Sequence, residues 1–197
     1  MANLSVRNQA LINSSNIYEQ SLCYHNRIWN TLSSLSDMKP ASFNNLRLLH
    51  HNVRSLYKKM FYYESLNLFE STDIFSVSET WLTPDIPDSL VDLPGFSIVR
   101  CDRKSTTKTR GGGAALFVKS SYKFSIISQL SVKLSRFCDS VWIKIPSSNN
   151  QHGYIIGSIY LPPDANKTEF ITMMSSILHQ NQYVGHKFIL LGDFNIN

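Results

Sequence analysis

Eight short segments rich in apolar, β-branched and aromatic residues follow one another from Phe43 onward, separated by turn residues. Short runs bounded by Gly, Pro, Asn and Asp are typical of β-strands. We predict strands within the segments 46–52, 72–82, 94–102, 111–120, 122–130, 139–146, 153–163 and 186–195. Residues 55–71 and 166–182 instead carry apolar side chains near a 3.6-residue period, which predicts helices. The alternation indicates an α/β fold of two or four layers, with a few helices covering the sheets.

The first 42 residues have a different composition. They are rich in Asn and Ser and contain no Gly. Within them, residues 14–35 carry apolar side chains near helical spacing, so one amphipathic helix and a loosely ordered segment are both compatible with the pattern. We therefore predict an N-terminal extension over residues 1–42, helical or disordered, followed by a domain over residues 43–197.

Composition excludes several classes of protein. Hydrophobic residues make up 43% of the 197-residue chain, as in globular proteins and unlike disordered ones. No run approaches the roughly 20 apolar residues that a membrane helix needs, and the first residues do not resemble a signal peptide. The three cysteines are scattered and form no metal or disulfide pattern. We expect a nuclear or cytoplasmic protein with no membrane partner.

Positive charge is concentrated in one segment. Residues 100–145 hold ten Lys or Arg against two acidic residues, within a chain of net charge +5. Four of the basic residues, Arg103, Lys104, Lys108 and Arg110, stand just before three consecutive glycines. A basic, glycine-ended loop suits contact with a phosphate backbone, and DNA is the partner we expect. Solvation of the outer face of a sheet explains the same charges equally well.

Polar side chains terminate several of the predicted strands. They are Asn52, Glu79, Tyr160, Asp193 and Asn195. In α/β folds, functional residues gather where the carboxyl ends of strands meet. Carboxylate and amide oxygens suit Mg²⁺, or Mn²⁺, more than zinc. Each residue also has a structural explanation, as a turn former, a cap, a rim aromatic or an Asx-turn, and the pattern alone leaves both interpretations open.

Five motifs occur in an order that resembles one superfamily. The stretches "HNVRSL", "SETWL", "RGGGAALFV", "IYLPP" and "LLGDFNIN" are similar to those of the endonuclease/exonuclease/phosphatase superfamily. The resemblance is strongest to the apurinic-endonuclease-like domain of non-LTR (LINE-type) retrotransposons, and it spans about residues 46–197. It implies a four-layer αββα sandwich of two facing mixed sheets and metal-dependent cleavage of DNA phosphodiesters.

The resemblance also implies a role for each candidate residue. Glu79 would be the principal Mg²⁺ ligand, with Asn52 beside it in the metal or phosphate shell. Asp193 would orient or deprotonate the attacking water. Tyr160 would contact the scissile phosphate or help the leaving group, and Asn195 would hold a phosphate oxygen. The basic loop around Arg103–Arg110 would lie on the DNA flank.

The sequence departs from the superfamily pattern at its C-terminal end. Superfamily domains continue with further strands and a late Asp–His element, whereas this sequence ends at Asn197. We therefore expect the C-terminal strands to be missing and the chain alone to be weakly active or inactive as a DNA endonuclease. Two alternatives remain: a non-catalytic remnant that binds nucleic acid or protein, and a phosphatase of the same superfamily.

Overall fold

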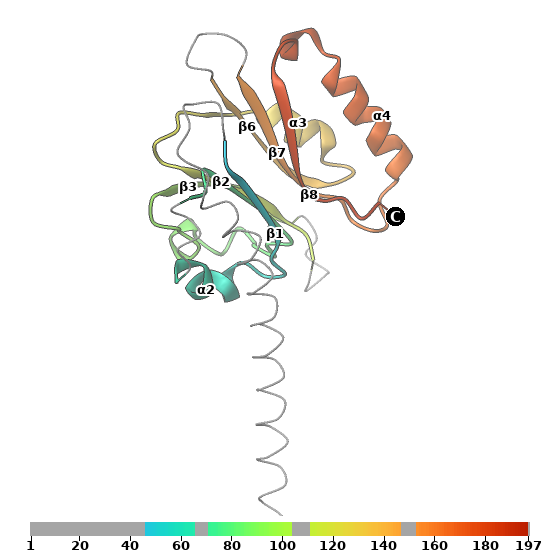
Figure 1. The fold of residues 1–197 in the computed structure, drawn as a ribbon. Helices are drawn as coiled ribbons and strands as arrows, with labels where there is room; N and C mark the ends of the chain where they lie inside the picture. The colour runs from blue at the N-terminus through green and yellow to red at the C-terminus, as the bar shows by residue number, and fades with distance from the viewer. Residues whose placement is uncertain (1–45, 66–70, 104–110, 147–152, 197) are drawn as a thin grey trace, which may run out of the picture. The chain divides into compact units, whose positions relative to one another are not determined.

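Residues 46–65, 71–103, 111–146 and 153–196 are described by the computed structural model, which is drawn in Figure 1. The predicted N-terminal extension, residues 1–42, lies outside the described residues. Among the residues described, no helix is both long and apolar enough to cross a membrane.

Within the residues that the structure describes, eight strands form two mixed sheets of four, and Figure 1 shows how the two sheets are arranged. The first sheet has the order β1 (Leu48–Asn52), β2 (Ile74–Ser78), β4 (Ala114–Lys119) and β3 (Phe96–Cys101). The second has the order β5 (Ser125–Ile126), β6 (Asp139–Ile145), β7 (Tyr154–Tyr160) and β8 (Lys187–Asp193). The pairs β1–β2 and β7–β8 are parallel, and every other neighbouring pair is antiparallel.

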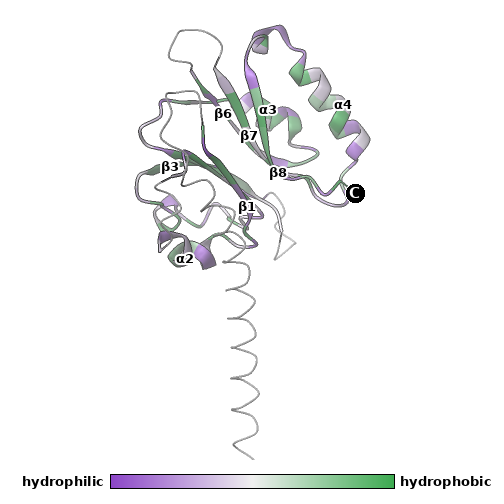
Figure 2. Ribbon diagram, in the orientation of Figure 1, coloured by the Kyte–Doolittle hydropathy of each residue, from purple (hydrophilic) through white to green (hydrophobic). Residues whose placement is uncertain are grey.

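An apolar layer joins the inner faces of the two sheets. Ile74 and Leu116 from the first sheet share a buried cluster with Ile143 and Ile156 from the second. Because side chains alternate across a strand, the residues between these positions point outward. Figure 2 shows the resulting hydrophobic colouring along the central strands.

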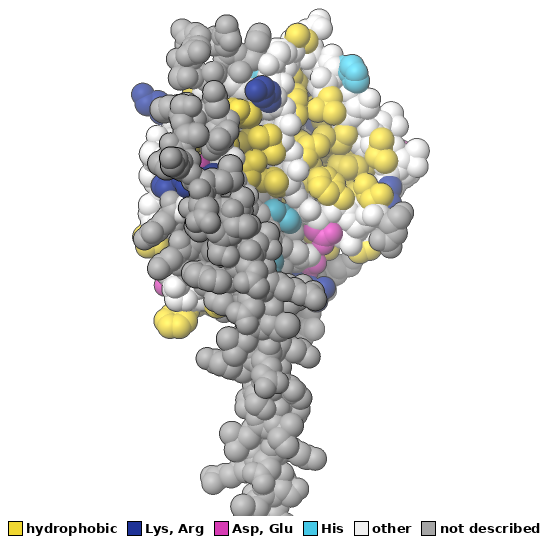
Figure 3. Space-filling model, viewed as in Figure 1, with side chains coloured by type: hydrophobic (Ala, Val, Ile, Leu, Met, Phe, Trp, Pro, Cys, Tyr) yellow, Lys and Arg dark blue, Asp and Glu magenta, His cyan; other side chains and the backbone are white. Residues whose placement is uncertain are grey.

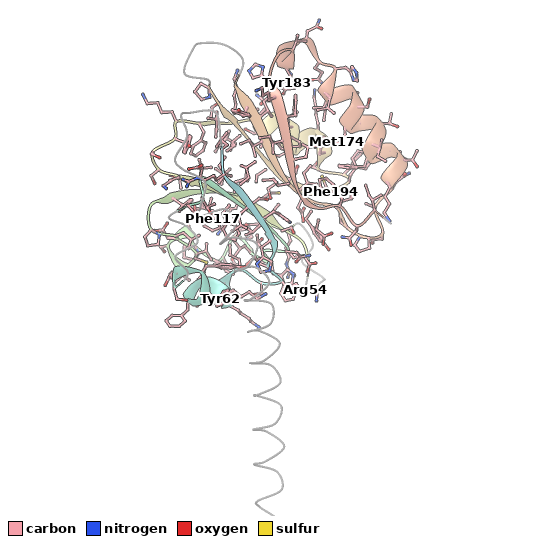
Figure 4. All side chains as sticks on the ribbon, in the orientation of Figure 1. Arg54, Tyr62, Phe117, Met174, Tyr183 and Phe194 are labelled. Carbon is pink, nitrogen blue, oxygen red and sulfur yellow. The ribbon has the colours of Figure 1, made fainter. Side chains whose placement is uncertain are left out.

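The helices cover the outer faces of both sheets. The short helices η1 (Tyr57–Lys59) and α2 (Met60–Glu64) pack on the first sheet, where Met60 and Tyr63 share a buried cluster with Phe75 and Phe117. Phe117 is labelled in Figure 4. On the second sheet, α3 (Ser128–Leu134) and α4 (Lys167–Leu178) cover Trp142, as does η4 (Asn181–Tyr183). A further 3₁₀ turn, η3, spans Asp88–Leu90. The predicted αββα sandwich of two facing mixed sheets is therefore confirmed.

Two element predictions need correction. The segment 122–130, predicted as one strand, contains only the two-residue strand β5 before α3 begins at Ser128. Leu130 and Leu134 are both fully buried, and they lie four residues apart in the sequence. This spacing is helical, and it continues past the end of the predicted strand. The helix predicted over 55–71 appears as η1 and α2, and residues 66–70 lie outside the described residues.

We predict that Phe117→Ala lowers the free energy of unfolding by about 3–5 kcal/mol, because it empties a fully buried site that stacks on Phe75. Phe61→Ala is the matched control: the same atoms are removed from a side chain that is 86% exposed, so the change stays within about 0.5 kcal/mol. Urea unfolding measures both. Equal losses in the two variants would contradict the assigned core.

A second prediction concerns pH. Burial lowers the pKa of His51 from 6.5 to about 4, and the positive charges of Lys59 and His50 act in the same direction. Its Nδ1 makes a hydrogen bond with the Tyr63 hydroxyl. Between pH 6.5 and 4 the unfolded chain binds this proton and the folded chain does not, so the stability is fully present above pH 6.5 and is lost as pH falls.

Because the ring is only partly buried, we expect the wild type to lose about 1–2 kcal/mol more between pH 7 and 4 than His51→Asn, which keeps a polar group near Nδ1. Urea unfolding at several pH values measures the difference. Parallel curves for the two proteins would show that His51 does not contribute to the acid sensitivity.

Candidate active site

The inner faces of the sheets change from apolar to polar toward one end of the sandwich. On β2 the inner-facing residues run Ile74, Ser76, Ser78, and on β7 they run Ile156, Ser158, Tyr160. The Ser76 hydroxyl donates to the Ser158 hydroxyl at 2.8 Å, which links the two sheets. His50 Nδ1 lies 2.9 Å from the Ser76 hydroxyl oxygen, and burial lowers the pKa of His50 although Asp193 opposes the shift.

The predicted polar residues lie at the ends of strands that meet at this polar end of the sandwich. Asn52, Tyr160 and Asp193 are the last residues of β1, β7 and β8. Tyr160 pairs directly with Asp193 across the parallel β7–β8 ladder. Glu79 follows the last residue of β2, which pairs with Asn52 across the β1–β2 ladder. Two parallel pairs, one in each sheet, thus deliver four side chains to the same place.

The Asn52 amide connects the two carboxylates. Its Nδ2 donates to Glu79 Oε1 at 2.8 Å and to Asp193 Oδ2 at 2.7 Å. Its Oδ1 is buried and has no hydrogen-bond partner among the described residues. A buried acceptor without a partner is costly, so it marks a place where a cation or a donor from a ligand fits.

Glu79 is held in a strained backbone conformation. Its φ of 54° lies in the left-handed region, which non-glycine residues seldom occupy. Ser55 donates its backbone N–H to the Glu79 carbonyl at 2.9 Å, and the Trp81 indole N–H donates to Glu79 Oε2 at 3.3 Å. Strain of this kind persists where the surroundings fix it, and it is concentrated at functional sites.

The three glycines form part of this support. Gly111, Gly112 and Gly113 have φ values of 84°, 82° and 85°. The Gly112 and Gly113 carbonyls accept backbone hydrogen bonds from Trp81 and Thr80 at 3.0 and 3.3 Å. A Cβ at Gly111 would lie 3.7 Å from the Tyr160 hydroxyl oxygen. The glycine turn therefore holds the Glu79 loop and borders the site.

Asp139 is a neighbouring carboxylate that sequence reasoning missed. It begins β6, pairs with Tyr160 and accepts a hydrogen bond from the Gly113 backbone N–H at 2.8 Å. The available signal was an acidic residue at the start of a predicted strand inside the most basic segment of the chain.

Tyr160 keeps its proton in this setting. Its side chain is largely buried, and burial raises the pKa of the phenol; the negative charges of Glu79, Asp193 and Asp139 raise it further. A neutral phenol can donate a hydrogen bond at neutral pH.

Asp193 and Asn195 form a local turn beside the site. The Asn195 backbone N–H donates to Asp193 Oδ1 at 3.3 Å, which is an Asx-turn. The Asn195 side chain donates to the Leu161 carbonyl at 2.9 Å, and its φ is 44°. Phe194 between them packs into the cluster under α4 (Figure 4). The carboxylate thus serves a structural turn and also faces Asn52.

Only part of the predicted basic loop can be located. Lys104, Lys108 and Arg110 lie outside the described residues. Arg103 donates its backbone N–H to the Leu82 carbonyl at 3.4 Å. Leu82 comes shortly after Glu79 in the sequence. Its Nε and Nη1 atoms are buried without a hydrogen-bond partner in the described part of the chain.

The donor set at the site suits only certain metals. Within the described ranges, no group of three or more His, Cys, Asp and Glu side chains is placed to hold a metal ion. A metal here would depend on the two carboxylates, the free Asn52 oxygen and water. Mg²⁺ and Mn²⁺ fit this set, because Mg²⁺ keeps several waters and takes only one or two protein carboxylates.

Comparison with known proteins identifies the fold. The catalytic domain of human Nocturnin matches at 14% identity with a TM-score of 0.53, over 77% of this chain and 64% of that one. An endonuclease/exonuclease/phosphatase family protein from Bacteroides thetaiotaomicron matches at 14% identity with a TM-score of 0.52, over 77% of this chain and 62% of that one. The chain has the endonuclease/exonuclease/phosphatase fold.

Other structures with the endonuclease/exonuclease/phosphatase fold show its range of functions. The endonuclease domain of TRAS1, a telomere-specific non-LTR retrotransposon, matches at 13% identity with a TM-score of 0.50, over 77% of this chain and 61% of that one. AP endonucleases and phosphatases are also among the matches. The chain spans less than two thirds of the length of the structures named here. No family model and no curated protein matches the sequence.

We predict that Asn52→Asp lowers the free energy of unfolding by roughly 1–3 kcal/mol in EDTA, because the bridging donor is replaced by a third carboxylate. Urea unfolding measures the loss. Asn181→Asp makes the same change at an exposed position and is expected to be nearly neutral. A wild-type stability for Asn52→Asp would show that the amide does not bridge Glu79 and Asp193.

Proposed function

We propose that this chain carries the metal-dependent phosphodiesterase site of a DNA endonuclease like those of non-LTR retrotransposons. The observation that carries the proposal is the Asn52 amide, which binds both Glu79 and Asp193 and leaves its own buried oxygen without a partner. The site contains two carboxylates bridged by one amide, beside a protonated phenol. This set of groups can bind a cation and a phosphate.

Glu79 and Asn52 are the proposed holders of Mg²⁺, with Mn²⁺ as a substitute. The ion would neutralise negative charge on the phosphate and on the leaving oxygen. Support for Glu79 comes from its strained, tightly bonded backbone, which fixes the carboxylate in advance. Such preorganisation reduces the cost of arranging charged groups during the reaction.

The remaining side chains act on the water and the phosphate. The Asp193 carboxylate orients the attacking water and accepts its proton, and the Asn52 amide fixes its position. Tyr160, which keeps its proton, donates a hydrogen bond to a phosphate oxygen. Asn195 holds a phosphate oxygen through the amide hydrogen that Leu161 leaves free.

DNA is the proposed substrate, and the basic residues are its proposed contacts. Arg103, Lys104, Lys108 and Arg110 precede the glycine turn that borders Tyr160, so a strand bound by them passes beside the site. Such contacts to phosphates position a nucleic acid without reading its sequence. A nuclear or cytoplasmic location remains the expectation from the sequence.

We expect weak Mg²⁺-dependent nicking of supercoiled plasmid that EDTA abolishes, in line with the weak or absent activity that the sequence predicts for this chain alone. Glu79→Gln and Asp193→Asn keep the size of each side chain, so each is expected to lower the rate at least about 100-fold without loss of fold. Glu169→Gln, on the exposed side of α4, is the matched control and keeps wild-type activity. Nicking that survives both site substitutions would refute the proposal.

The same preparation separates the two alternatives. A phosphatase would release phosphate from a phosphomonoester and leave the plasmid intact. A non-catalytic binding protein would shift labelled DNA at low salt with no cleavage, and Asp193→Asn would not affect the shift. Salt dependence of that shift would measure the number of phosphate contacts.

A further inference from the structure

Two hydrogen bonds link the sheets at the polar end of the sandwich. On one side, the Asn52 amide at the end of β1 donates to Asp193 Oδ2 at the end of β8, at 2.7 Å. On the other side, the Gly113 backbone N–H just before β4 donates to Asp139 Oδ2 at the start of β6, at 2.8 Å. Figure 3 shows one face of the molecule, on which acidic and histidine side chains lie beside a hydrophobic area. An ionised acceptor makes the second link a strong hydrogen bond.

The stacking of the sheets places Glu79 and Tyr160 between these two links. β1 lies against β8, β2 against β7 and β4 against β6. Glu79 follows β2 and Tyr160 ends β7, so both belong to the middle pair of strands. Burial raises the pKa of Tyr160, and Glu79 is close enough for its charge to add to that shift. The two links therefore flank the carboxylate of one sheet and the phenol of the other.

The glycine turn connects Asp139 to the Glu79 loop. Thr80 and Trp81, the two residues after Glu79, donate their backbone N–H groups to carbonyls of this turn at 3.3 and 3.0 Å. The Asp139 carboxylate packs directly against the turn, since a Cβ at Gly112 would lie only 3.0 Å from Asp139 Oδ2. A carboxylate of the second sheet thus holds the backbone that supports a carboxylate of the first.

Tyr160 lies on the other side of the same turn. Asp139 and Tyr160 are directly opposite each other in the antiparallel β6–β7 ladder, so their side chains lie on the same face of the sheet. A Cβ at Gly111 would lie 3.7 Å from the Tyr160 hydroxyl oxygen. The turn that Asp139 holds therefore contacts the phenol as well as the Glu79 loop.

We propose that Asp139 is a positioning residue, which sets the distance between the Glu79 carboxylate and the Tyr160 hydroxyl by holding the glycine turn to the second sheet. Its role rests on the proposed function, in which Glu79 holds the cation and Tyr160 contacts the phosphate. Asp139 acts on both through the Gly113 N–H and touches neither the cation nor the phosphate. A misplacement of about 1 Å in a catalytic site can cost about 100-fold in rate, so one hydrogen bond at this place affects catalysis.

Amide hydrogen exchange of the metal-free chain, followed by NMR, tests the link directly. Asp139→Ala removes the acceptor, so the N–H groups of Thr80 and Trp81 are expected to exchange at least about tenfold faster. The N–H of Leu161, which donates to a β8 carbonyl beside the other link, is expected to keep its wild-type rate. Asp139→Asn retains an oxygen that can accept from Gly113, so slow exchange should return.

Asp92→Ala removes the same atoms from an exposed carboxylate and is the matched control, with exchange as in the wild type. An equal acceleration at Leu161 would show that Asp139 only stabilises the fold as a whole. Slow exchange at Trp81 in Asp139→Ala would show that the glycine turn does not depend on the link. Fast exchange in Asp139→Asn would show that the charge acts and the hydrogen bond does not. Each of these three results would overturn the proposal.

Nicking of supercoiled plasmid in Mg²⁺ tests the consequence for catalysis. Asp139→Ala is expected to lower kcat at least about tenfold with little change in KM, because the reacting groups remain but are misplaced. Asp139→Asn is expected to keep most of the rate, and Asp92→Ala all of it. An unchanged kcat in Asp139→Ala, beside an active wild type, would overturn the proposal. A wild-type chain that does not nick DNA would refute the proposed function instead, and the exchange rates would then decide whether Asp139 holds the turn.

Discussion

The rest of the structure depends on the apolar layer between the two sheets. Ile74 and Leu116 on one side and Ile143 and Ile156 on the other exclude water along the middle of the sandwich. The strands are short, so the layer ends within a few residues, and the same inward-facing positions then carry serine, asparagine, tyrosine and aspartate. Polar groups there face one another across the gap between the sheets. The candidate site is the place where the two inner faces stop being hydrophobic.

That position explains the network of hydrogen bonds around the carboxylates. Polar groups shielded from water need partners, and the Asn52 amide satisfies both Glu79 and Asp193. The Glu79 loop is fixed from two sides, by Ser55 and by the glycine turn, even though its φ is unfavourable. The apolar core therefore stabilises a strained loop, and the loop holds a carboxylate in place. Core packing and site geometry are coupled through these few backbone bonds.

The sequence predicted most of the fold because the strands are strongly patterned. Runs such as "YIIGSIY" and "KFILLG" are short, apolar and bounded by turns, and they became β7 and β8. The secondary structure of the segment after Tyr122 was predicted wrongly, because its β-branched residues resemble a strand while Leu130 and Leu134 follow a helical period. Leu130 and Leu134 pack in one buried cluster with Trp142, and this packing favours the helix. The sequence did not predict Asp139 as a site residue, because its contacts, Gly113 and Tyr160, are distant from it along the chain.

The sequence by itself determined which residue types end the strands, since the alternation of apolar and polar side chains fixes the inner face of each strand. It also determined the concentration of basic residues before the glycine turn. Only the tertiary structure decided that Asn52 lies between Glu79 and Asp193, 27 and 141 residues away along the chain. It likewise decided that Tyr160 lies beside Asp193, through the parallel pairing of β7 and β8. Both depend on strand order and on the stacking of the two sheets, which arise from long-range packing and which no local pattern specifies.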